Sequence, residues 1–393
     1  MTLLEHLKLL RSSEGQEVLT ALRDLAPTAA IEIAIATRLR KSFPSELVTA
    51  AMSMHDLRVR ARAKFARADE MWFTRDGLEQ ATSESIAAHR ASRFAGLSKV
   101  ADLCCGIGGD LLALAGQASQ AQLLAVDRDP LHLAIAALNA DMLGVRGRIT
   151  FVEADVRDAD IHGLPGIFID PARRSDRGRM SLGQSEPPLE WCLELDQPGR
   201  VVGIKCAPGL DHLRVPDGWE FEAIALGTDL KEAVLWSPAA ARASASATVI
   251  EGDAIHRLQP CPGDPVTVRA PVAGETLLDP NPAVTRAGLV EDLARTIGAG
   301  KIDDQIGFLV ASSPVVTPFG RSLRIVDSLP WNEKHLRTRL RDLDAGAIDI
   351  RRRGLAGDVD AITRRLRGKG GQPFTIAMTR VANQPWALIC RPA

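Results

Sequence analysis

The sequence predicts an α/β protein whose central part is a doubly wound, mostly parallel sheet. From about residue 98 to residue 206, short aliphatic runs alternate with helical stretches, as expected for consecutive βαβ units. Before about residue 95, apolar residues recur at three- and four-residue spacing, which is the helical period. The 393 residues also exceed one domain of about 150 residues. We therefore expect a helical N-terminal region, an α/β domain, a connecting region and a small α+β domain, with limits 1–95, 96–240, 241–323 and 324–393.

The N-terminal region is expected to be helical throughout. Its first residues, "MTLLEHLKLLRSSEG", have charges spaced among the leucines, which favours an amphipathic helix over a signal peptide. Helical periodicity continues in 17–26, 28–39 and 46–66, and Pro27 and Pro44 lie where helices should begin or end. No run of about 18 apolar residues occurs. We expect a cytoplasmic protein that does not enter a membrane.

The strands of the α/β domain are expected in five short runs. Two helical stretches, "DLLALAGQAS" and "PLHLAIAALNADMLG", separate the first three of these runs. "FEAIAL" and "EAVLWSP" follow Gly218 and are expected to add an antiparallel hairpin. The five runs are "KVADLCC", "AQLLAVD", "RITFVEAD", "GIFIDPA" and "RVVGIKCAP".

The cysteines argue against a disulfide framework and against a metal site. The chain has six, and none lies in a C-x-x-C pair. Cys104 and Cys105 are adjacent, so in an extended segment their side chains point to opposite faces. We expect reduced cysteines that pack as small apolar residues, and no metal.

A glycine loop follows the first of the five strands. Gly106, Gly108 and Gly109 lack Cβ atoms, so the backbone can turn sharply there and approach a ligand closely. The helix after them adds N–H donors at its N-terminus. The spacing is G-x-G-G, with Leu111 where a dinucleotide fingerprint has its third glycine. This departure argues against a nicotinamide-dependent oxidoreductase.

Carboxylates lie before and after the glycine loop at regular structural positions. Asp102, Asp127 and Asp155 each lie at the carboxyl end of one of three successive strands. In such sheets, ligands bind in the crevice at this edge. Asp127 lies eighteen residues after Gly109, where a carboxylate can accept hydrogen bonds from both ribose hydroxyls. A nucleoside-containing ligand is therefore expected.

These segments resemble a known family. "DLCCGIGGD", "AVDRD", "EAD" and "IDPAR" resemble class I S-adenosylmethionine-dependent methyltransferases, which have a Rossmann-like fold, over about residues 70–240. "GLEQATSESIAAHRASRF" resembles the segment before the glycine loop of RNA guanine-N2 methyltransferases of the trimethylguanosine-synthase type. "RIVDSLPWNEKHLRTRL", "IDIRRRG" and "TIAMTRV" resemble the THUMP-like C-terminal domain of a bacterial group of these enzymes. The resemblance implies S-adenosyl-L-methionine as the cofactor and methyl transfer as the activity.

The resemblance also assigns cofactor-binding residues. Asp127 is expected to hold the ribose and Asp155 the adenine amine. The methionine part of the cofactor is expected to lie against Asp102, Cys104, Gly106, Gly108 and Gly109.

The acceptor is expected at the end of the fourth strand. Asp170 and Pro171 occupy the start of the D/N-P-P-Y/F/W motif of amino-methylating relatives, but Ala172 and Arg173 stand at its last two positions. The chain has no tyrosine, so the usual stacking partner is missing from this motif. Asp170, Pro171 and Arg173 are our catalytic candidates. Trp72 and Phe73 either supply a stacking face or pack between helices, and Thr82 is a further substrate-binding candidate.

Basic residues favour a nucleic-acid substrate. Arg173, Arg174, Arg177 and Arg179 lie close together, and guanidinium groups suit bidentate phosphate contacts. Residues 324–393 hold fourteen Lys and Arg against seven Asp and Glu, a net charge of +7, although the whole chain has a net charge of −1. The resemblance favours RNA, either tRNA or rRNA, as the partner. A merely solvated basic surface is the alternative.

Two further alternatives remain open. Cys206 and Pro208 partly match the S-C-N-P motif of pyrimidine-C5 methyltransferases, in which the cysteine is a nucleophile. The altered Asp170-Pro171-Ala172-Arg173 motif also allows an RNA-binding protein that has lost catalysis. Lys205 is expected to bind substrate phosphate, to pair with Asp170 or to reach solvent.

Overall fold

The computed structural model describes residues 2–25, 31–172, 174–175, 178–179 and 185–392; for 174–175 and 178–179 it describes the backbone alone. The chain forms two compact units. The first comprises Met1–Cys206 with Leu235–Ala241, and the second comprises Ala207–Val234 with Arg242–Ala393. Each unit is described by itself below.

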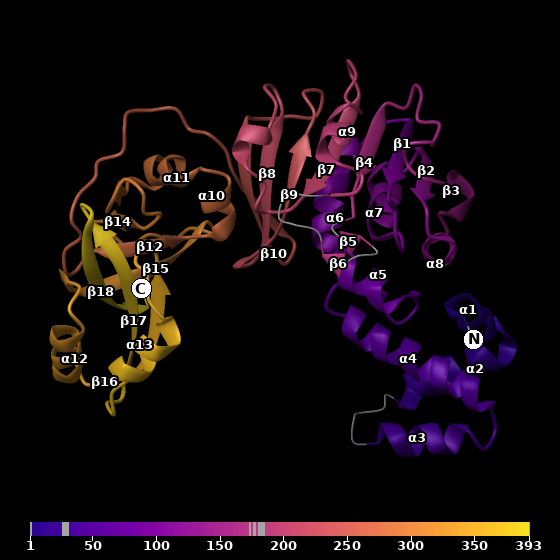
Figure 1. Ribbon diagram of the computed structural model, residues 1–393, viewed down its shortest axis with the longest axis horizontal. Helices are drawn as coiled ribbons and strands as arrows, with labels where there is room; N and C mark the ends of the chain where they lie inside the picture. Colours follow the sequence, from indigo (N-terminus) through magenta and orange to yellow (C-terminus); the bar gives the residue numbers. More distant parts are fainter. Residues whose placement is uncertain (1, 26–30, 173, 176–177, 180–184, 393) are drawn as a thin grey trace. The chain divides into compact units, whose positions relative to one another are not determined.

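Helices form the beginning of the first unit (Figure 1). The amphipathic character of the first residues is confirmed, because Leu7 and Leu10 are buried while a capping box joins Thr2 and Glu5 at the helix N-terminus. Leu7, Val18 and Leu22 pack in one apolar cluster. The helices are α1 (Leu3–Arg11), α2 (Ser13–Leu25), α3 (Glu32–Leu39), α4 (Ser45–Ala61), α5 (Arg75–Gln80) and α6 (Glu84–Ala91).

A parallel sheet forms the rest of the first unit, as predicted. Its strands are hydrogen-bonded in the order β7-β4-β1-β2-β3, and every neighbouring pair is parallel. Helices α7 (Gly109–Gln117) and α8 (Pro130–Met142) connect the first three strands, and α9 (Leu189–Leu193) precedes β7. The strands are β1 (Lys99–Leu103), β2 (Gln122–Asp127), β3 (Ile149–Glu153), β4 (Gly166–Ile169) and β7 (Val201–Cys206), with a two-stranded ribbon β5 (Arg174–Ser175) and β6 (Gly178–Arg179) between β4 and β7.

The register of the parallel strands determines where the loops lie. Leu103 of β1 pairs with Val126 of β2 and with Ile169 of β4. The residues that follow these strands therefore emerge at the same edge of the sheet, which is the edge where ligands bind in this architecture.

The second unit begins with strands that belong partly to a segment expected to be a connection. β10 (Ala245–Glu251) pairs in parallel with β8 (Glu220–Leu226) and antiparallel with β11 (Ala254–Leu258). β10 was not predicted, because its Ala/Ser-rich sequence lacks the apolar run of a strand. Its polar side chains are instead buried against acidic ones. Ser246 Oγ donates to Glu220 Oε1 at 2.5 Å, and Thr248 Oγ1 donates to Glu222 Oε1. Strand β9 (Asp229–Trp236) crosses the boundary between the two units.

A seven-stranded sheet follows in the second unit, in the order β13-β14-β12-β15-β18-β17-β16. The predicted terminal hairpin is confirmed: β17 and β18 are antiparallel, and Ala382 and Asn383 have positive φ at the turn between them. The strands are β12 (Thr276–Pro280), β13 (Gly300–Lys301), β14 (Leu309–Ala311), β15 (Gly320–Pro330), β16 (Ala345–Arg352), β17 (Gln372–Val381) and β18 (Gln384–Pro392); the helices are α10 (Pro282–Arg286), α11 (Val290–Ile297), α12 (Glu333–Asp342) and α13 (Val359–Leu366).

Within the described ranges, no helix combines the length and the apolar composition needed to cross a bilayer.

Candidate active site

A cavity of about 530 Å³ lies in the first unit at the carboxyl edge of the parallel sheet. Its walls come from the segments after β1, β2, β3 and β4, from Lys205 in β7, and from residues of α5 and of the segment between α5 and α6. Its size falls within the range of small-molecule sites, about 300 to 1,000 Å³. The candidate residues that line it are Thr82, Cys104, Gly106, Gly109, Asp127, Asp155, Asp170, Pro171 and Lys205.

The glycine loop follows β1 and turns through left-handed backbone conformations. Cys104, Gly106 and Gly108 have φ of 61°, 53° and 89°. A Cβ on Gly108 would meet Ala136 Cβ at 3.2 Å, so glycine there allows α8 to pack closely on the loop. Cys104 is a non-glycine residue in a strained region, as is often found at functional sites. Gly108 does not line the cavity, whereas Cys104, Gly106 and Gly109 do.

Asp127 holds this loop from the end of β2. Its Oδ2 accepts a hydrogen bond from the backbone N–H of Gly106 at 2.8 Å, and its Oδ1 accepts from the N–H of Asp129 at 2.9 Å. A carboxylate has about four acceptor positions, so Asp127 retains the capacity to accept hydroxyl hydrogen bonds from the cavity. The side chain therefore both shapes the loop and faces the ligand space.

Asp155 is engaged by an arginine that the sequence did not single out. Arg157 Nε lies 2.9 Å from Asp155 Oδ1, and Arg157 Nη2 lies 3.2 Å from Oδ2. The backbone N–H and the guanidinium of Arg157 lower the pKa of Asp155. Arg157 also pairs with Glu186, which follows the arginine-rich loop. Asp155, Arg157 and Glu186 thus form one ionic cluster on the cavity wall.

Asp102 lies beneath the cavity rather than in its wall. Its side chain is buried, and neither carboxylate oxygen has a hydrogen-bond partner among the described residues. Burial raises the pKa of Asp102 well above its usual value, and the nearby carboxylates of Asp110 and Asp170 raise it further. Arg90, paired with Asp110, opposes that rise. Asp102 is therefore not among the residues that line the cavity, and the expected contact between its side chain and the cofactor stays a prediction.

Asp170 emerges after β4 and meets Lys205 from β7. Lys205 Nζ lies 2.6 Å from Asp170 Oδ2 and 2.9 Å from Thr82 Oγ1. The Asp170 side chain is 28% exposed, whereas that of Lys205 is 5% exposed. Of the three alternatives for Lys205, the structure supports pairing with Asp170.

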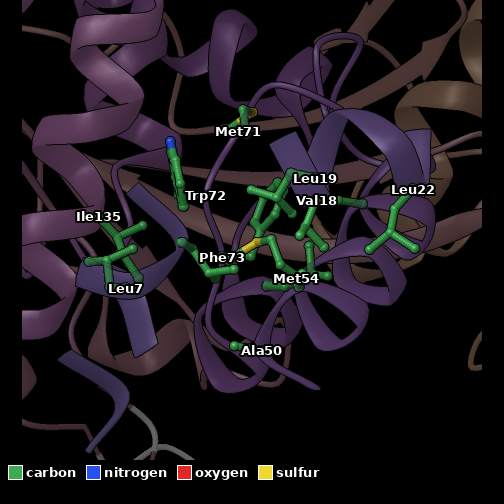
Figure 2. Packing of buried hydrophobic residues seen from close by; sticks show 14 of the residues in the cluster. Leu7, Val18, Leu19, Leu22, Ala50, Met54, Met71, Trp72, Phe73 and Ile135 are labelled. Atoms are coloured by element: carbon green, nitrogen blue, oxygen red, sulfur yellow. The ribbon is translucent and has the colours of Figure 1, made fainter. Parts of the chain in front are cut away.

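Trp72 and Phe73 lie in the apolar core of the first unit, where Figure 2 shows them among Leu7, Leu19 and Met54. Their exposed fractions are 8% and 3%, and neither lines the cavity. The stacking-face interpretation is corrected, because a ring enclosed by core side chains has no face free for a base. The packing alternative describes both residues.

Cys206, the nucleophile that the pyrimidine-C5 alternative needs, does not line this cavity. Cys206 is buried, is not part of the cavity wall, and its Sγ lies 3.4 Å from the carbonyl oxygen of Ile204. Burial raises the pKa of the Cys104 thiol and that of the Cys105 thiol. Within the described residues, no group of His, Cys, Asp and Glu side chains is arranged to hold a metal ion. The pyrimidine-C5 alternative therefore lacks its nucleophile at this site.

Part of the arginine-rich loop is outside the described residues. Arg173 and Arg177 are not described, and of Arg174 and Arg179 only the backbone is described, in the ribbon of β5 and β6. Their expected phosphate contacts stay predictions.

Comparisons with known proteins agree with this geometry. Residues 100–165 match the methyltransferase-domain family, residues 320–392 match the family described as THUMP domain-like, and residues 3–61 match a domain of unknown function. An uncharacterized S-adenosylmethionine-dependent methyltransferase of Mycobacterium tuberculosis, found in two strains, is 37% identical over 337 residues, which cover 82% of this chain and 89% of the relative. The chain belongs to the S-adenosylmethionine-dependent methyltransferases. A putative methyltransferase from Porphyromonas gingivalis W83 shares the fold, with a TM-score of 0.71, 20% identity and coverage of 90% of this chain and 92% of that chain.

The cavity of this methyltransferase suits its cofactor, S-adenosylmethionine, in charge as well as in size. The sulfonium is cationic, and acidic side chains outnumber basic ones among the described residues of the wall. Because the wall is concave and only partly open to water, these carboxylates attract a cation more strongly than they would on a flat surface. The acidic residues are Glu79, Asp110, Asp127, Asp129, Asp155, Asp170 and Glu186; the basic ones are Arg128, Arg157 and Lys205.

Two residues that sequence reasoning missed hold the walls of the methyltransferase site. Asn139, fully buried on α8, donates to the carbonyl oxygens of Trp72 at 3.1 Å and Ile107 at 3.0 Å. Lys64 donates to the carbonyl oxygens of Leu78 and Ala81, each at 2.7 Å. An asparagine inside the apolar run "AIAALNADML" was a readable signal, whereas Lys64 had none.

Proposed function

We propose that this methyltransferase methylates a base of tRNA or rRNA in the cytoplasm, with Asp170 orienting the acceptor. The observation that carries the catalytic part is the position of Asp170. It lines the cavity directly after β4, next to the glycine loop, and its backbone N–H donates to the carbonyl oxygen of Leu103 at 3.2 Å. A carboxylate there accepts a hydrogen bond from an acceptor N–H without blocking the loop.

The bound cofactor supplies an electrophilic methyl group. The protein then has to hold the acceptor in line with that methyl group and exclude water, and alignment of this kind is a large part of catalysis. We propose that Asp127 and Asp155 bind the nucleoside part of the cofactor, and that Cys104, Gly106 and Gly109 border its methionine part. Pro171 would border the acceptor, and Arg173 with its neighbours in the loop would contact its phosphates.

The charge of the C-terminal domain supports RNA as the substrate class. Helices α12 and α13 expose cations that form no ion pair with other described residues, namely Lys334, Arg337, Arg341 and Arg364. Exposed, unpaired Lys and Arg side chains bind the phosphate backbone by releasing counterions. We propose that residues 324–393 bind RNA and that residues 1–95 support the wall of the cofactor site in the domain formed by 96–240.

The test is methyl transfer from labelled S-adenosylmethionine to size-fractionated RNA from a strain that lacks this gene. We expect label in one fraction with the wild-type protein and none with Asp170→Ala, while calorimetry gives similar cofactor Kd values for both. Label that persists with Asp170→Ala would remove Asp170 from the mechanism. Cofactor binding without label in any RNA would favour a non-catalytic RNA-binding protein or another acceptor.

A further inference from the structure

The pair of Asp170 and Lys205 follows from the strand register. β4 and β7 are parallel neighbours, with Ile169 opposite Ile204. The next residue on each strand is Asp170 and Lys205, so the two side chains emerge side by side at the cavity. The 2.6 Å contact of Lys205 Nζ with Asp170 Oδ2 is thus a consequence of the sheet itself.

A third element fixes the ammonium. Thr82 lies between α5 and α6, in the wall that Lys64 holds through the carbonyl oxygen of Ala81. Thr82 Oγ1 accepts a hydrogen bond from Lys205 Nζ at 2.9 Å, and Thr82 is itself buried, with 7% of its surface exposed. Lys205 therefore connects the acceptor side of the sheet with the wall that precedes the glycine loop.

This location argues against phosphate binding by Lys205. Its ammonium is bonded to a carboxylate and a hydroxyl, and only 5% of its side chain is exposed. A phosphate-binding lysine has to bring its ammonium to a solvated anion, which would break both interactions and leave Asp170 without its cation.

Other ionisable side chains lie near the pair of Asp170 and Lys205. Nearby carboxylates oppose the ionisation of one another, and a cation in contact favours the charged form. Asp102 on β1 lies near Asp170, and Asp110 on α7, Asp127 on β2 and Arg90 on α6, which is paired with Asp110, lie near Asp102.

We infer that Lys205, held by Thr82, is a positioning residue for methyl transfer: its ammonium binds Asp170 Oδ2, so that Oδ1 is presented to an acceptor N–H. The inference rests on the proposed function, in which Asp170 orients the acceptor.

The test compares full-length Lys205→Met, Lys205→Arg and Thr82→Val with Lys99→Met, an exposed lysine at the opposite end of β1. We expect Lys205→Met to lower the single-turnover methyl-transfer rate about 100-fold at neutral pH, since one partner of a buried ion pair is removed. Cofactor Kd should stay within about twofold, and the acidic limb of the rate–pH profile should move to higher pH, because a carboxylate without its cation holds its proton longer. Lys205→Arg should recover part of the rate, and Thr82→Val should cost about fivefold, the value of one hydrogen bond.

A second readout needs no RNA. In protein labelled with ¹³C at aspartate carboxyl groups, the Asp170 signal is assigned by its absence in Asp170→Asn. Its titration midpoint should move upward in Lys205→Met and stay in place in Lys99→Met. An unchanged midpoint, or an unchanged rate–pH profile, would overturn the inference. A moved midpoint in a protein that methylates no RNA would overturn the proposed function and leave only the pairing of Lys205 with Asp170 standing.

Discussion

The parallel sheet of the first unit and the seven-stranded sheet of the second unit present their charged residues in opposite ways. In the parallel sheet, every strand ends at the same edge, so Asp127, Asp155 and Asp170 all reach one cavity. In the seven-stranded sheet most neighbours are antiparallel, and the cations lie on the exposed sides of α12 and α13. The difference teaches that a parallel topology concentrates chemistry in a few residues, whereas an antiparallel one spreads it over a surface.

The charged residues of the two sheets also differ in burial, and burial determines how large the effect of removing one of them is. The Lys205 side chain is almost fully buried, so removal of its charge leaves the half-buried carboxylate of Asp170 without its cation. The Arg365–Glu333 pair joins α13 to α12 with both side chains partly exposed, at 48% and 33%. Solvent and salt screen such a pair, so its contribution to stability is small. Substitution of a single charged residue is therefore expected to have a large effect in the site of the first unit and a small, additive effect on the C-terminal surface. Substitutions in the apolar core of either sheet are the exception, because they should be large in both units.

The largest expected effect tests that exception. Phe308 lies before the THUMP-like range 320–392 but is fully buried in the sheet core with Leu323 and Leu388. Phe308→Ala should lower the free energy of unfolding by about 3 to 5 kcal/mol, as measured by urea denaturation. Val316→Ala, at a fully exposed valine nearby, should change it by under about 0.5 kcal/mol. Equal effects of the two variants would show that this segment only connects domains.

The next effect concerns the concentrated site. Asp127→Ala should weaken S-adenosylmethionine binding by about 100-fold, because it removes a charged acceptor worth about 1.5 to 3 kcal/mol per hydrogen bond. Asp129→Ala is the matched control two residues away. Its carboxylate also lines the cavity, but it accepts a hydrogen bond from the N–H of Leu131 at 2.8 Å as the cap of α8. Its removal should cost about 1 kcal/mol of stability and, through its long-range attraction for the sulfonium alone, at most about threefold in cofactor affinity. Calorimetry measures both, and a Kd that changes equally in the two variants would contradict a specific role of Asp127.

The parallel sheet was predictable because its strands are short apolar runs separated by helices. The strands of the second unit were less so. β10 is Ala/Ser-rich because it pairs buried hydroxyls with buried glutamates, and β13 and β14 have only two and three residues. Alternation of polar and apolar residues cannot reveal a strand whose polar face is also buried.

The sequence predicted which residues follow the strands and reach the site, but not which of the candidate residues are buried. Register alone brings Asp127, Asp155 and Asp170 to one edge, so position in the sequence was sufficient. Whether a residue at that edge faces the cavity or the interior depends on the helices packed against it. In the folded protein Asp102 is buried, and Phe73 lies inside the apolar cluster of the first unit. No local sequence pattern indicates this packing.

A smaller effect is expected from Asp102, the buried carboxyl group beneath the cavity. Its raised pKa means that the folded protein holds a proton that the unfolded chain releases above about pH 4. This group therefore contributes full stability below that pH and loses it as the pH rises toward the folded pKa. Asp102→Asn should gain stability over the wild type by up to about 1.4 kcal/mol per pH unit across this window. Urea denaturation at several pH values measures the gain. A difference that is constant with pH would contradict the raised pKa, and the exposed Asp141→Asn should differ by under about 0.5 kcal/mol.

The smallest effects are expected on the C-terminal surface. If the C-terminal domain binds RNA as proposed, Arg337→Ala and Arg364→Ala should each weaken that binding a few-fold, because each removes one exposed cation. The slope of log K against log salt should fall by about 0.7 to 0.9 for each phosphate that the protein no longer neutralises. Arg11→Ala, an exposed arginine of α1, is the control and should leave the slope unchanged. Filter binding at several salt concentrations gives the slopes, and calorimetry should show an unaltered cofactor Kd in all three variants. If one of these arginines abolished binding by itself, the C-terminal domain would hold a concentrated site like that of the first unit, and the contrast between the two sheets would fail.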